Sequence, residues 1–146
     1  MTNKTGFKTA QEHALERVHA LFNQDAASKE LGIKILSADL GRCDLSLCVS
    51  NNLIQGHDIC HGGYLFMLAD TALAFAANTY GEACVVSTAS IEFLRPAKLG
   101  DVLIAKAREQ HKHKRTGLYD VSVYNQKECL VALYRGKSHQ LARSSN

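Results

Sequence analysis

The stretch from His61 to Asn78, HGGYLFMLADTALAFAAN, constrains the fold more than any other part of the sequence. Its apolar residues fall on nearly the whole circumference of a helix: Leu65, Phe66, Leu68, Ala69, Ala72, Leu73, Phe75 and Ala76. We predict one long helix over residues 62–80, stopped by Gly81. Because a helix that is apolar all round is covered on every side, this helix must lie inside the fold.

A single sheet packed against this helix covers only one side of it, so a second surface is required. Small residues are expected on its outer face, where they would let another helix or subunit approach closely: Ala69, Ala72, Ala74 and Ala77. A homodimer with two-fold symmetry is the simplest source of that second surface.

The rest of the chain predicts two short helical segments and several strands. Apolar spacing predicts a first helix over residues 9–24 and a helical turn that ends at Gly32. Strands are predicted at 33–40, 42–49, 84–94, 102–110, 117–124 and 129–134, with a loop at 51–59 and a polar turn at 111–116. Consecutive strands with short connections favour antiparallel pairing. We therefore predict an α+β fold in which a curved antiparallel β-sheet wraps around one long central helix, with an extra N-terminal helix.

The composition bounds the class of protein. The 146 residues, 46% of them apolar and 21% charged, indicate a single domain over residues 1–146 with a sizeable core. The net charge of +3 is too mild to indicate a nucleic-acid partner. The N-terminal residues carry no secretory signal, and the apolar run 64–77 is shorter than a membrane span. We expect a cytoplasmic protein with no membrane partner.

Neither the cysteines nor the histidines form a metal or redox motif. No two of the five cysteines stand as Cys-x-x-Cys, and Cys60, beside the His-Gly-Gly, is kept as a weak functional candidate. His57 and His61 stand at positions i and i+4, but glycines flank the pair and exclude the helix that a metal site of this spacing needs. We expect no metal.

Asp70 is the charged residue of the long helix, and two explanations for it stay open. It is either a structural carboxylate satisfied by hydrogen bonds, or a nucleophile or general base in an apolar pocket. Gly62 and Gly63 stand where the helix begins, so the first N–H groups lack helical partners. With the helix dipole behind them, these N–H groups suit a polarised carbonyl, as acyl transfer requires. The alternative for the two glycines is a simple tight turn.

The spacing of these groups decides whether one chain suffices. Gly62 and Asp70 are eight residues apart, which is about 12 Å along a helix axis. Attack on a carbonyl needs the reacting atoms within about 3–3.5 Å of each other. A catalytic role for both groups therefore requires two antiparallel helices from two subunits.

Three segments, HGGYLFMLAD, IEFLRPAKLGD and YRGKSH, resemble the hotdog-fold acyl-CoA thioesterases, most closely those of phenylacetic-acid degradation. The resemblance runs from the first helix to His139. It implies the hotdog fold, a homodimer that completes the active site, and a homotetramer built as a dimer of dimers. It also implies hydrolysis of an aryl- or arylacetyl-CoA thioester to the free acid and CoA. Coenzyme A is then part of the substrate, and no cofactor is expected.

The resemblance further implies the roles of individual residues. Asp70 would attack the thioester carbonyl or activate the attacking water, and the Gly62 N–H would polarise the carbonyl. Gln55 would contact the thioester or the water. Asp70 would come from one subunit, and Gln55 and Gly62 from its partner. His61 is expected to orient the loop and the helix start, with a direct catalytic role as the alternative.

Substrate contacts are expected from a wider set of residues: Gly63, Asn78, Ser87, Thr88, Arg95, Lys114 and Arg115. The hydroxyl that positions water stays open between Ser87 and Thr88, because Ala74 stands where some relatives carry a hydroxyl residue. The basic segment 111–117, HKHKRTG, is either a solvated hairpin tip or a contact for CoA phosphates. Further candidates for the nucleotide end of CoA are Lys98, Arg135 and Lys137.

Two other classes of function stay open beside the thioesterase. A non-catalytic acyl-CoA-binding or regulatory hotdog protein would bind the thioester without releasing a thiol. A hotdog enoyl-CoA hydratase would pair a catalytic histidine with the acid across the site. Thiol release and enoyl-CoA hydration are the measurements that separate the three.

Overall fold

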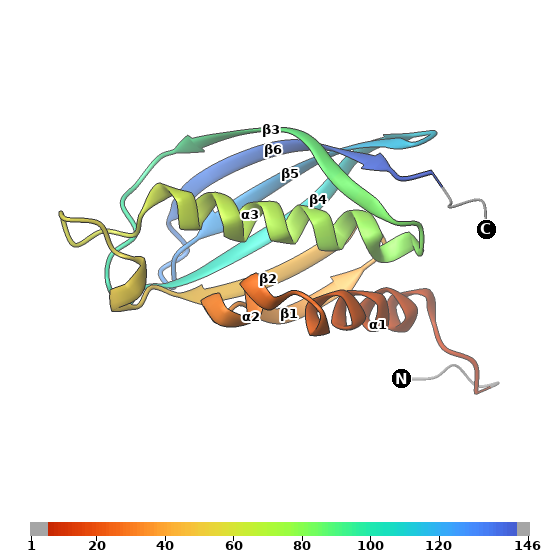
Figure 1. The fold of residues 1–146 in the computed structure, drawn as a ribbon, viewed down its shortest axis with the longest axis horizontal. Helices are drawn as coiled ribbons and strands as arrows, with labels where there is room; N and C mark the ends of the chain where they lie inside the picture. Colours follow the sequence, from red (N-terminus) through yellow and green to blue (C-terminus); the bar gives the residue numbers. More distant parts are fainter. Residues whose placement is uncertain (1–5, 143–146) are drawn as a thin grey trace.

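The computed structural model describes residues 6–142, in which an antiparallel sheet curves around one central helix (Figure 1). The helical elements are α1 (Ala10–Asn23), α2 (Ala26–Leu31), α3 (Gly62–Ala77) and the 3-10 turns η1 (Asn51–Leu53) and η2 (Asn78–Tyr80). The strands are β1 (Lys34–Asp39), β2 (Arg42–Cys48), β3 (Cys84–Phe93), β4 (Val102–His113), β5 (Thr116–Tyr124) and β6 (Leu130–Gln140). The six strands run in the order β1-β2-β4-β5-β6-β3, and every neighbouring pair is antiparallel.

The two N-terminal helices begin and end at residues suited to those positions. Thr9 caps α1 by accepting a hydrogen bond from the Glu12 N–H, and Asp25 caps α2 in the same way through the Ser28 N–H. Gly32 ends α2 at φ 90°, a left-handed conformation that glycine adopts without strain. Both helices lie along the β1 side of the sheet and cover one flank of α3 (Figure 1).

Helix α3 lies in the concave face of the sheet and contributes much of the core. Leu68 and Leu73 are fully buried among residues of the inner sheet face, such as Leu45, Leu103 and Val121. Apolar residues occupy nearly the whole circumference of α3 because the sheet and α1 both pack against it. No helix in residues 6–142 is long and apolar enough to span a membrane.

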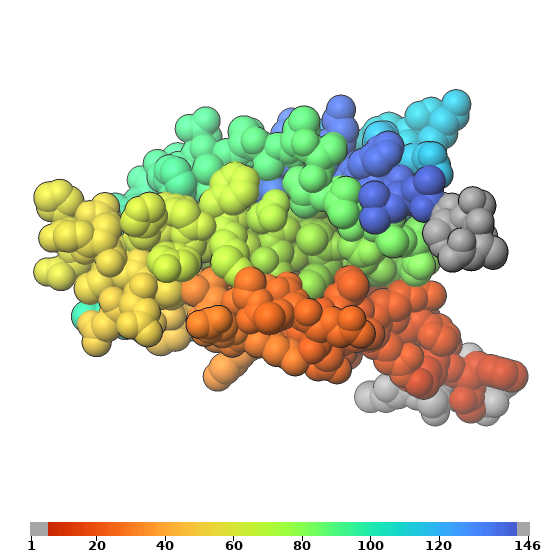
Figure 2. All heavy atoms as spheres, in the orientation of Figure 1, coloured from red at the N-terminus to blue at the C-terminus, as the bar shows by residue number. Residues whose placement is uncertain are grey.

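The outer face predicted for this helix is wrong at three of its four alanines and right at Ala74. Ala69, Ala72 and Ala77 are buried inside the single chain, where α3 packs mainly against the sheet. The stripe of α3 that remains uncovered instead runs through Phe66, which is 36% exposed, and includes half-buried residues (Met67, Asp70, Ala74). Figure 2 shows this stripe of α3 between the N-terminal helices and β3.

Strand β6 is longer than predicted. The sequence pattern ended it at Tyr134, but the strand continues to Gln140 with Arg135 and Lys137 turned outward and Gly136 and Ser138 buried. Because the residues at these inward positions are small, the sequence shows no alternating apolar pattern there. The β4–β5 turn is also tighter than the predicted segment 111–116, since β4 runs to His113 and β5 starts at Thr116.

Strand β3 forms an edge of the sheet. It pairs with β6 along one side, and within residues 6–142 no strand pairs with its other side. Two apolar side chains of this strand are well exposed, Val85 at 45% and Phe93 at 54%. An open edge with exposed apolar residues is a template for pairing with another chain.

Candidate active site

The start of α3 presents an N–H group that the chain itself does not use. His61 caps the helix, and its Nδ1 accepts a hydrogen bond from the Gly63 N–H at 3.1 Å. The Gly62 N–H has no acceptor among the described residues. Since the helix dipole adds positive potential at this end, the Gly62 N–H is suited to bind a carbonyl oxygen or an anion.

A cavity of about 340 Å³ opens in front of this N–H. Its walls come from the loop before α3, the start of α3 and the segment after β3: Gln55, Ile59, Cys60, Gly62, Leu65, Phe93, Leu94, Arg95, Pro96 and Ala97. The loop is tied to the segment after β3 by a hydrogen bond from the Cys60 N–H to the Ala97 carbonyl at 2.7 Å. Three predicted site residues, Gln55, Gly62 and Arg95, therefore line one cavity.

The Phe93 side chain lies close to the backbone of Gly62. A Cβ at this position would lie 3.0 Å from the tip of the Phe93 ring. Glycine therefore lets the aromatic ring lie directly against the helix start, with the N–H still open to a ligand.

Gln55 has one half of its amide free. Its Oε1 accepts a hydrogen bond from the His57 N–H at 3.1 Å, which holds the side chain against the loop. Its Nε2 has no acceptor among the described residues, and none of their fully buried polar side-chain atoms lacks a partner, so the Nε2 reaches solvent. This arrangement leaves an amide donor on the cavity wall.

Asp70 lies on the uncovered stripe of α3, outside the walls of that cavity. Its Oδ1 accepts a hydrogen bond of 2.6 Å from the Tyr134 hydroxyl on β6. Its Oδ2 has no donor among the described residues. Because no fully buried polar side-chain atom of these residues lacks a partner, Oδ2 is accessible to solvent. The carboxylate is thus partly satisfied within the chain and partly free. Sequence reasoning missed Tyr134, although its inward parity with Ala132 on the same strand was available as a signal.

Three predicted substrate contacts are used within the fold or face elsewhere. The Asn78 amide donates to the carbonyls of Ala74 and Cys84 and accepts from the Cys84 N–H, which joins the end of α3 to β3. Ser87 lies in a β-bulge, and its hydroxyl donates to the Lys137 carbonyl at 3.2 Å. Thr88 lies opposite Lys137, on the outer face of the sheet. Neither hydroxyl contacts Asp70 in the single chain.

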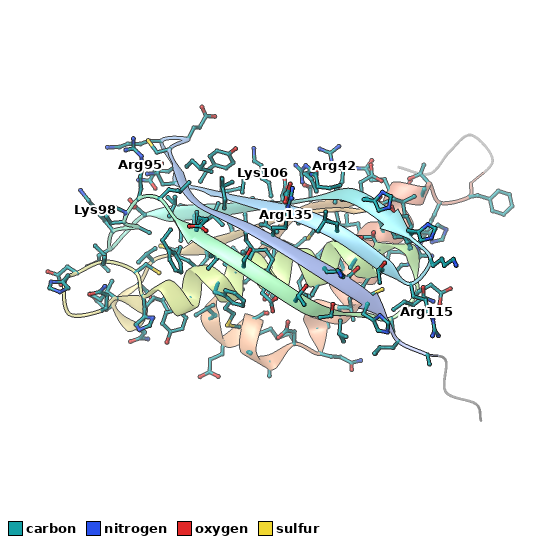
Figure 3. The ribbon with its side chains drawn as sticks, turned by 90° about the horizontal axis from the view of Figure 1, so that it is seen from above. Arg42, Arg95, Lys98, Lys106, Arg115 and Arg135 are labelled. Atoms are coloured by element: carbon teal, nitrogen blue, oxygen red, sulfur yellow. The ribbon has the colours of Figure 1, made fainter. Side chains whose placement is uncertain are left out.

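The candidate cations for CoA phosphates separate into distinct places. Arg95 and Lys98 lie at one end of the molecule, beside the cavity, whereas Arg115 lies at the opposite end with the β4–β5 turn that also holds Lys114 (Figure 3). Arg135 is paired on the outer sheet face with Asp120, with N···O distances of 2.6 and 2.9 Å. Within one chain, the cations next to the Gly62 cavity are therefore Arg95 and Lys98.

Cys60 is a structural thiol. It is 4% exposed, and burial raises its pKa to about 11, so it is protonated at neutral pH and is a poor nucleophile. Among residues 6–142 no group of three or more His, Cys, Asp or Glu side chains is arranged to hold a metal ion.

His61→Ala is expected to lower the free energy of unfolding by about 0.5–2 kcal/mol, because the helix loses its N-cap acceptor. His61→Asn keeps a short side-chain acceptor and is expected to recover most of that loss. Denaturant titrations of the three proteins at one protein concentration measure the difference. Equal stability of His61→Ala and the wild type would contradict the capping role.

Comparison with known proteins gives one family. The model of the thioesterase superfamily matches residues 57–132. The acyl-coenzyme A thioesterase PaaI of Escherichia coli is 47% identical over 128 residues, which are 88% of this chain and 91% of that protein. The solved structure of E. coli PaaI superposes with a TM-score of 0.90 at 45% identity, covering 92% of this chain and 97% of that one.

Two more distant structures have the same fold. A mutant PaaI of Thermus thermophilus has a TM-score of 0.77 at 33% identity, over 80% of this chain and 100% of that one. A hypothetical thioesterase of Streptococcus pneumoniae, solved with coenzyme A, has a TM-score of 0.74 at 27% identity, over 78% of this chain and 92% of that one. The α+β fold and the resemblance drawn from the sequence are confirmed.

Proposed function

The chain belongs to the thioesterase superfamily and is an acyl-CoA thioesterase, and we propose that it hydrolyses aryl- or arylacetyl-CoA thioesters of the phenylacetyl-CoA type. The observation that carries the proposal is the unpartnered Gly62 N–H in the wall of an apolar cavity that Gln55 also lines. Together the Gly62 N–H and the Gln55 amide form a pair of donors for one thioester group.

In this proposal the thioester lies at the start of α3. Its carbonyl oxygen accepts from the Gly62 N–H, and the Gln55 amide donates to the thioester or to the attacking water. The aryl group packs on apolar side chains of the cavity, such as Leu65 and Phe93. Arg95 and Lys98 attract the phosphates at the other end of the substrate, and the relative solved with coenzyme A supports such a ligand.

We assign the attack on the carbonyl to Asp70 of the neighbouring subunit. As a general base it takes a proton from water while the water oxygen bonds to the carbonyl carbon, which gives a tetrahedral oxyanion held by the Gly62 N–H. The oxyanion then collapses, the C–S bond breaks, and the CoA thiolate leaves and takes up a proton. As a nucleophile the same carboxylate would bond to the carbonyl carbon and displace the CoA thiolate, which takes up a proton, and water would then hydrolyse the resulting mixed anhydride to the free acid and the carboxylate.

A shared site requires a homodimer, and two features of the chain support one. The open edge of β3 carries exposed apolar residues, and α3 leaves an uncovered stripe around Asp70. A two-fold axis perpendicular to α3 and next to these features would run the two α3 helices antiparallel, and we place each start against the middle of the other. We propose a homodimer as the catalytic unit and a homotetramer of two dimers.

Thiol release from a panel of CoA esters tests the function. The expected order of kcat/KM is arylacetyl and aryl esters above aliphatic esters, with no change after dialysis against a chelator. Tight binding of acyl-CoA without thiol release would instead indicate a binding protein, and hydration of an enoyl-CoA would indicate a hydratase. An aliphatic preference would overturn the assigned acyl group alone.

Complementation between two inactive variants tests the sharing of the site. Asp70→Asn and Gly62→Pro chains are each expected to be nearly inactive, but a mixed dimer has one site with an intact carboxylate and an intact N–H. Coexpression with two different affinity tags, followed by double purification under conditions that separate tetramers into dimers, isolates this mixed dimer. Its expected activity is about half that of the wild type, because one of two sites works. A site built within one chain would give no recovery.

A further inference from the structure

Asp70 is held by a side chain to which no role has been assigned. The Tyr134 hydroxyl donates to Asp70 Oδ1 at 2.6 Å, across from β6 to α3. We infer that Tyr134 is a positioning residue, which fixes one oxygen of the Asp70 carboxylate so that the other faces the substrate. This inference rests on the proposed function, because it assumes that Asp70 carries out the attack.

The residues packed around the Tyr134 ring hold it in place. Tyr134 is 2% exposed, and the Phe66 ring meets it edge to face with the ring centroids 5.3 Å apart. Gly136, two residues later on the same strand face, leaves the room for it. A Cβ at Gly136 would lie 3.0 Å from Tyr134 Cε1, 3.2 Å from its hydroxyl and 2.6 Å from Leu73 Cδ1. The ring therefore has one well-defined position, from which its hydroxyl reaches Asp70.

The surroundings of Tyr134 keep its hydroxyl protonated, so that it remains a hydrogen-bond donor. Burial, and then the hydrogen bond to Asp70, raise the pKa of Tyr134 far above its ordinary value. The phenol therefore stays protonated and remains a hydrogen-bond donor to Asp70. With Oδ1 occupied, Oδ2 is the oxygen left to accept a proton from water or to attack.

No other titratable group of the described chain contacts this pair. The neighbours of Tyr134 on the inner sheet face are Ile91 on β3 and Val121 on β5, and the ring that packs on it from α3 is Phe66. The charged residues of β6 point to the outer face. The titratable side chains at the start of α3 are His61 and Tyr64, and in the proposed antiparallel arrangement those of the other subunit would face the middle of this helix.

Tyr134→Phe removes the hydroxyl and keeps the ring against Phe66 and Gly136. We expect kcat to fall about 10- to 100-fold, the size that one hydrogen bond to a charged group corresponds to, with little change in KM. The acid limb of the kcat/KM profile is expected to move to higher pH, because a donor to the charged carboxylate is lost. Thiol release from the best CoA ester of the panel, measured across pH, gives all three quantities.

Tyr119→Phe is the matched control. Tyr119 is 1% exposed, lies against Gly117 as Tyr134 lies against Gly136, and donates to a carboxylate, Glu109, at 3.3 Å. Its pKa is raised by burial and by Glu109 in the same way. Both variants are expected to lose similar thermal stability, but only Tyr134→Phe is expected to change kcat and the pH profile. Equal kinetic effects in the two variants would reduce Tyr134 to a structural role and overturn the inference.

Asp70→Asn separates this inference from the proposed function. If Asp70→Asn stays active, the catalytic role of Asp70 fails, and the positioning role fails with it. If Asp70→Asn is inactive while Tyr134→Phe matches the wild type, the positioning role alone fails. The double variant is expected to be no slower than Asp70→Asn, because both changes act through one carboxylate. A further loss in the double variant would contradict that pathway.

A measurement on the wild-type side chain does not depend on the folding of Tyr134→Phe. A short hydrogen bond from a buried phenol to a carboxylate is expected to give a downfield hydroxyl proton that exchanges slowly in NMR spectra. This resonance should move upfield in Asp70→Asn and stay in place in Tyr119→Phe. A spectrum with no such Asp70-dependent proton would contradict the hydrogen bond on which the inference depends.

Discussion

Asp70→Asn is expected to lower kcat for thioester hydrolysis by about 10²- to 10⁴-fold, the range that general-base catalysis contributes. The amide keeps an oxygen to accept from the Tyr134 hydroxyl, so the fold and the subunit assembly are expected to persist. What the variant lacks is a second oxygen able to take a proton from water. Thiol release at saturating substrate, with sedimentation of both proteins, measures rate and assembly together.

The control for this variant is Asp44→Asn, which makes the same change at another half-buried carboxylate. Asp44 pairs with Arg108 on β4, at 2.6 Å, away from α3. Its loss is expected to affect stability slightly and kcat not at all. Hydrolysis by Asp70→Asn at a rate near that of the wild type would remove Asp70 from the mechanism.

Gly62→Pro is expected to lower kcat by about 10²- to 10³-fold, the loss seen when one oxyanion donor is removed. Proline deletes the N–H that would polarise the carbonyl, and the first position of a helix is where proline is tolerated best. His61 before it has φ −61° and ψ 133°, a conformation that a residue preceding proline favours. The backbone therefore accepts the change, and the effect falls on the reaction.

Gly62→Ala separates the lost N–H from the added bulk. Both variants place a carbon 3.0 Å from the Phe93 ring, which is more than half exposed and can turn aside. Alanine keeps the N–H, so its kcat is expected to lie well above that of the proline variant. If alanine and proline slow the enzyme equally, crowding at Phe93 is the cause, and the N–H has no role in the reaction.

The elements predicted best from the sequence are those whose own apolar spacing and end residues indicate which side is buried and where the element stops. The first helix has a clear apolar stripe and a Thr9 cap. Helix α3 begins at two glycines, and the turn η2 that continues it ends at Gly81. Strand β6 was cut short because its later inward residues, Gly136 and Ser138, are small. Gly136 lies against Leu73 of α3 and Ser138 against Gly117 of β5, and periodicity within one strand does not report contacts with other elements.

The residues of the candidate site also fall into those that the sequence predicted and those that only the fold reveals. Gln55 and Gly62 were chosen by motif and resemblance, and Arg95 by its position near the end of a predicted strand. The structure brings all three to one cavity because the loop before α3 pairs with the segment after β3. Tyr134 was missed because its contact with Asp70 joins residues 64 positions apart. The Asn78 amide, predicted to bind substrate, is bonded between α3 and β3. A side chain that connects two elements cannot be told from a ligand contact by sequence alone.

The separation of the Gly62 cavity from Asp70 along α3 has a consequence for how the enzyme responds to dilution. A lone folded subunit would still have a place for the thioester, yet it would hold that ligand about 12 Å from the acid that cleaves it. Such a subunit would sequester substrate instead of consuming it. Turnover per chain would then rise with enzyme concentration until subunits are fully associated, so abundance would set specific activity as well as total rate.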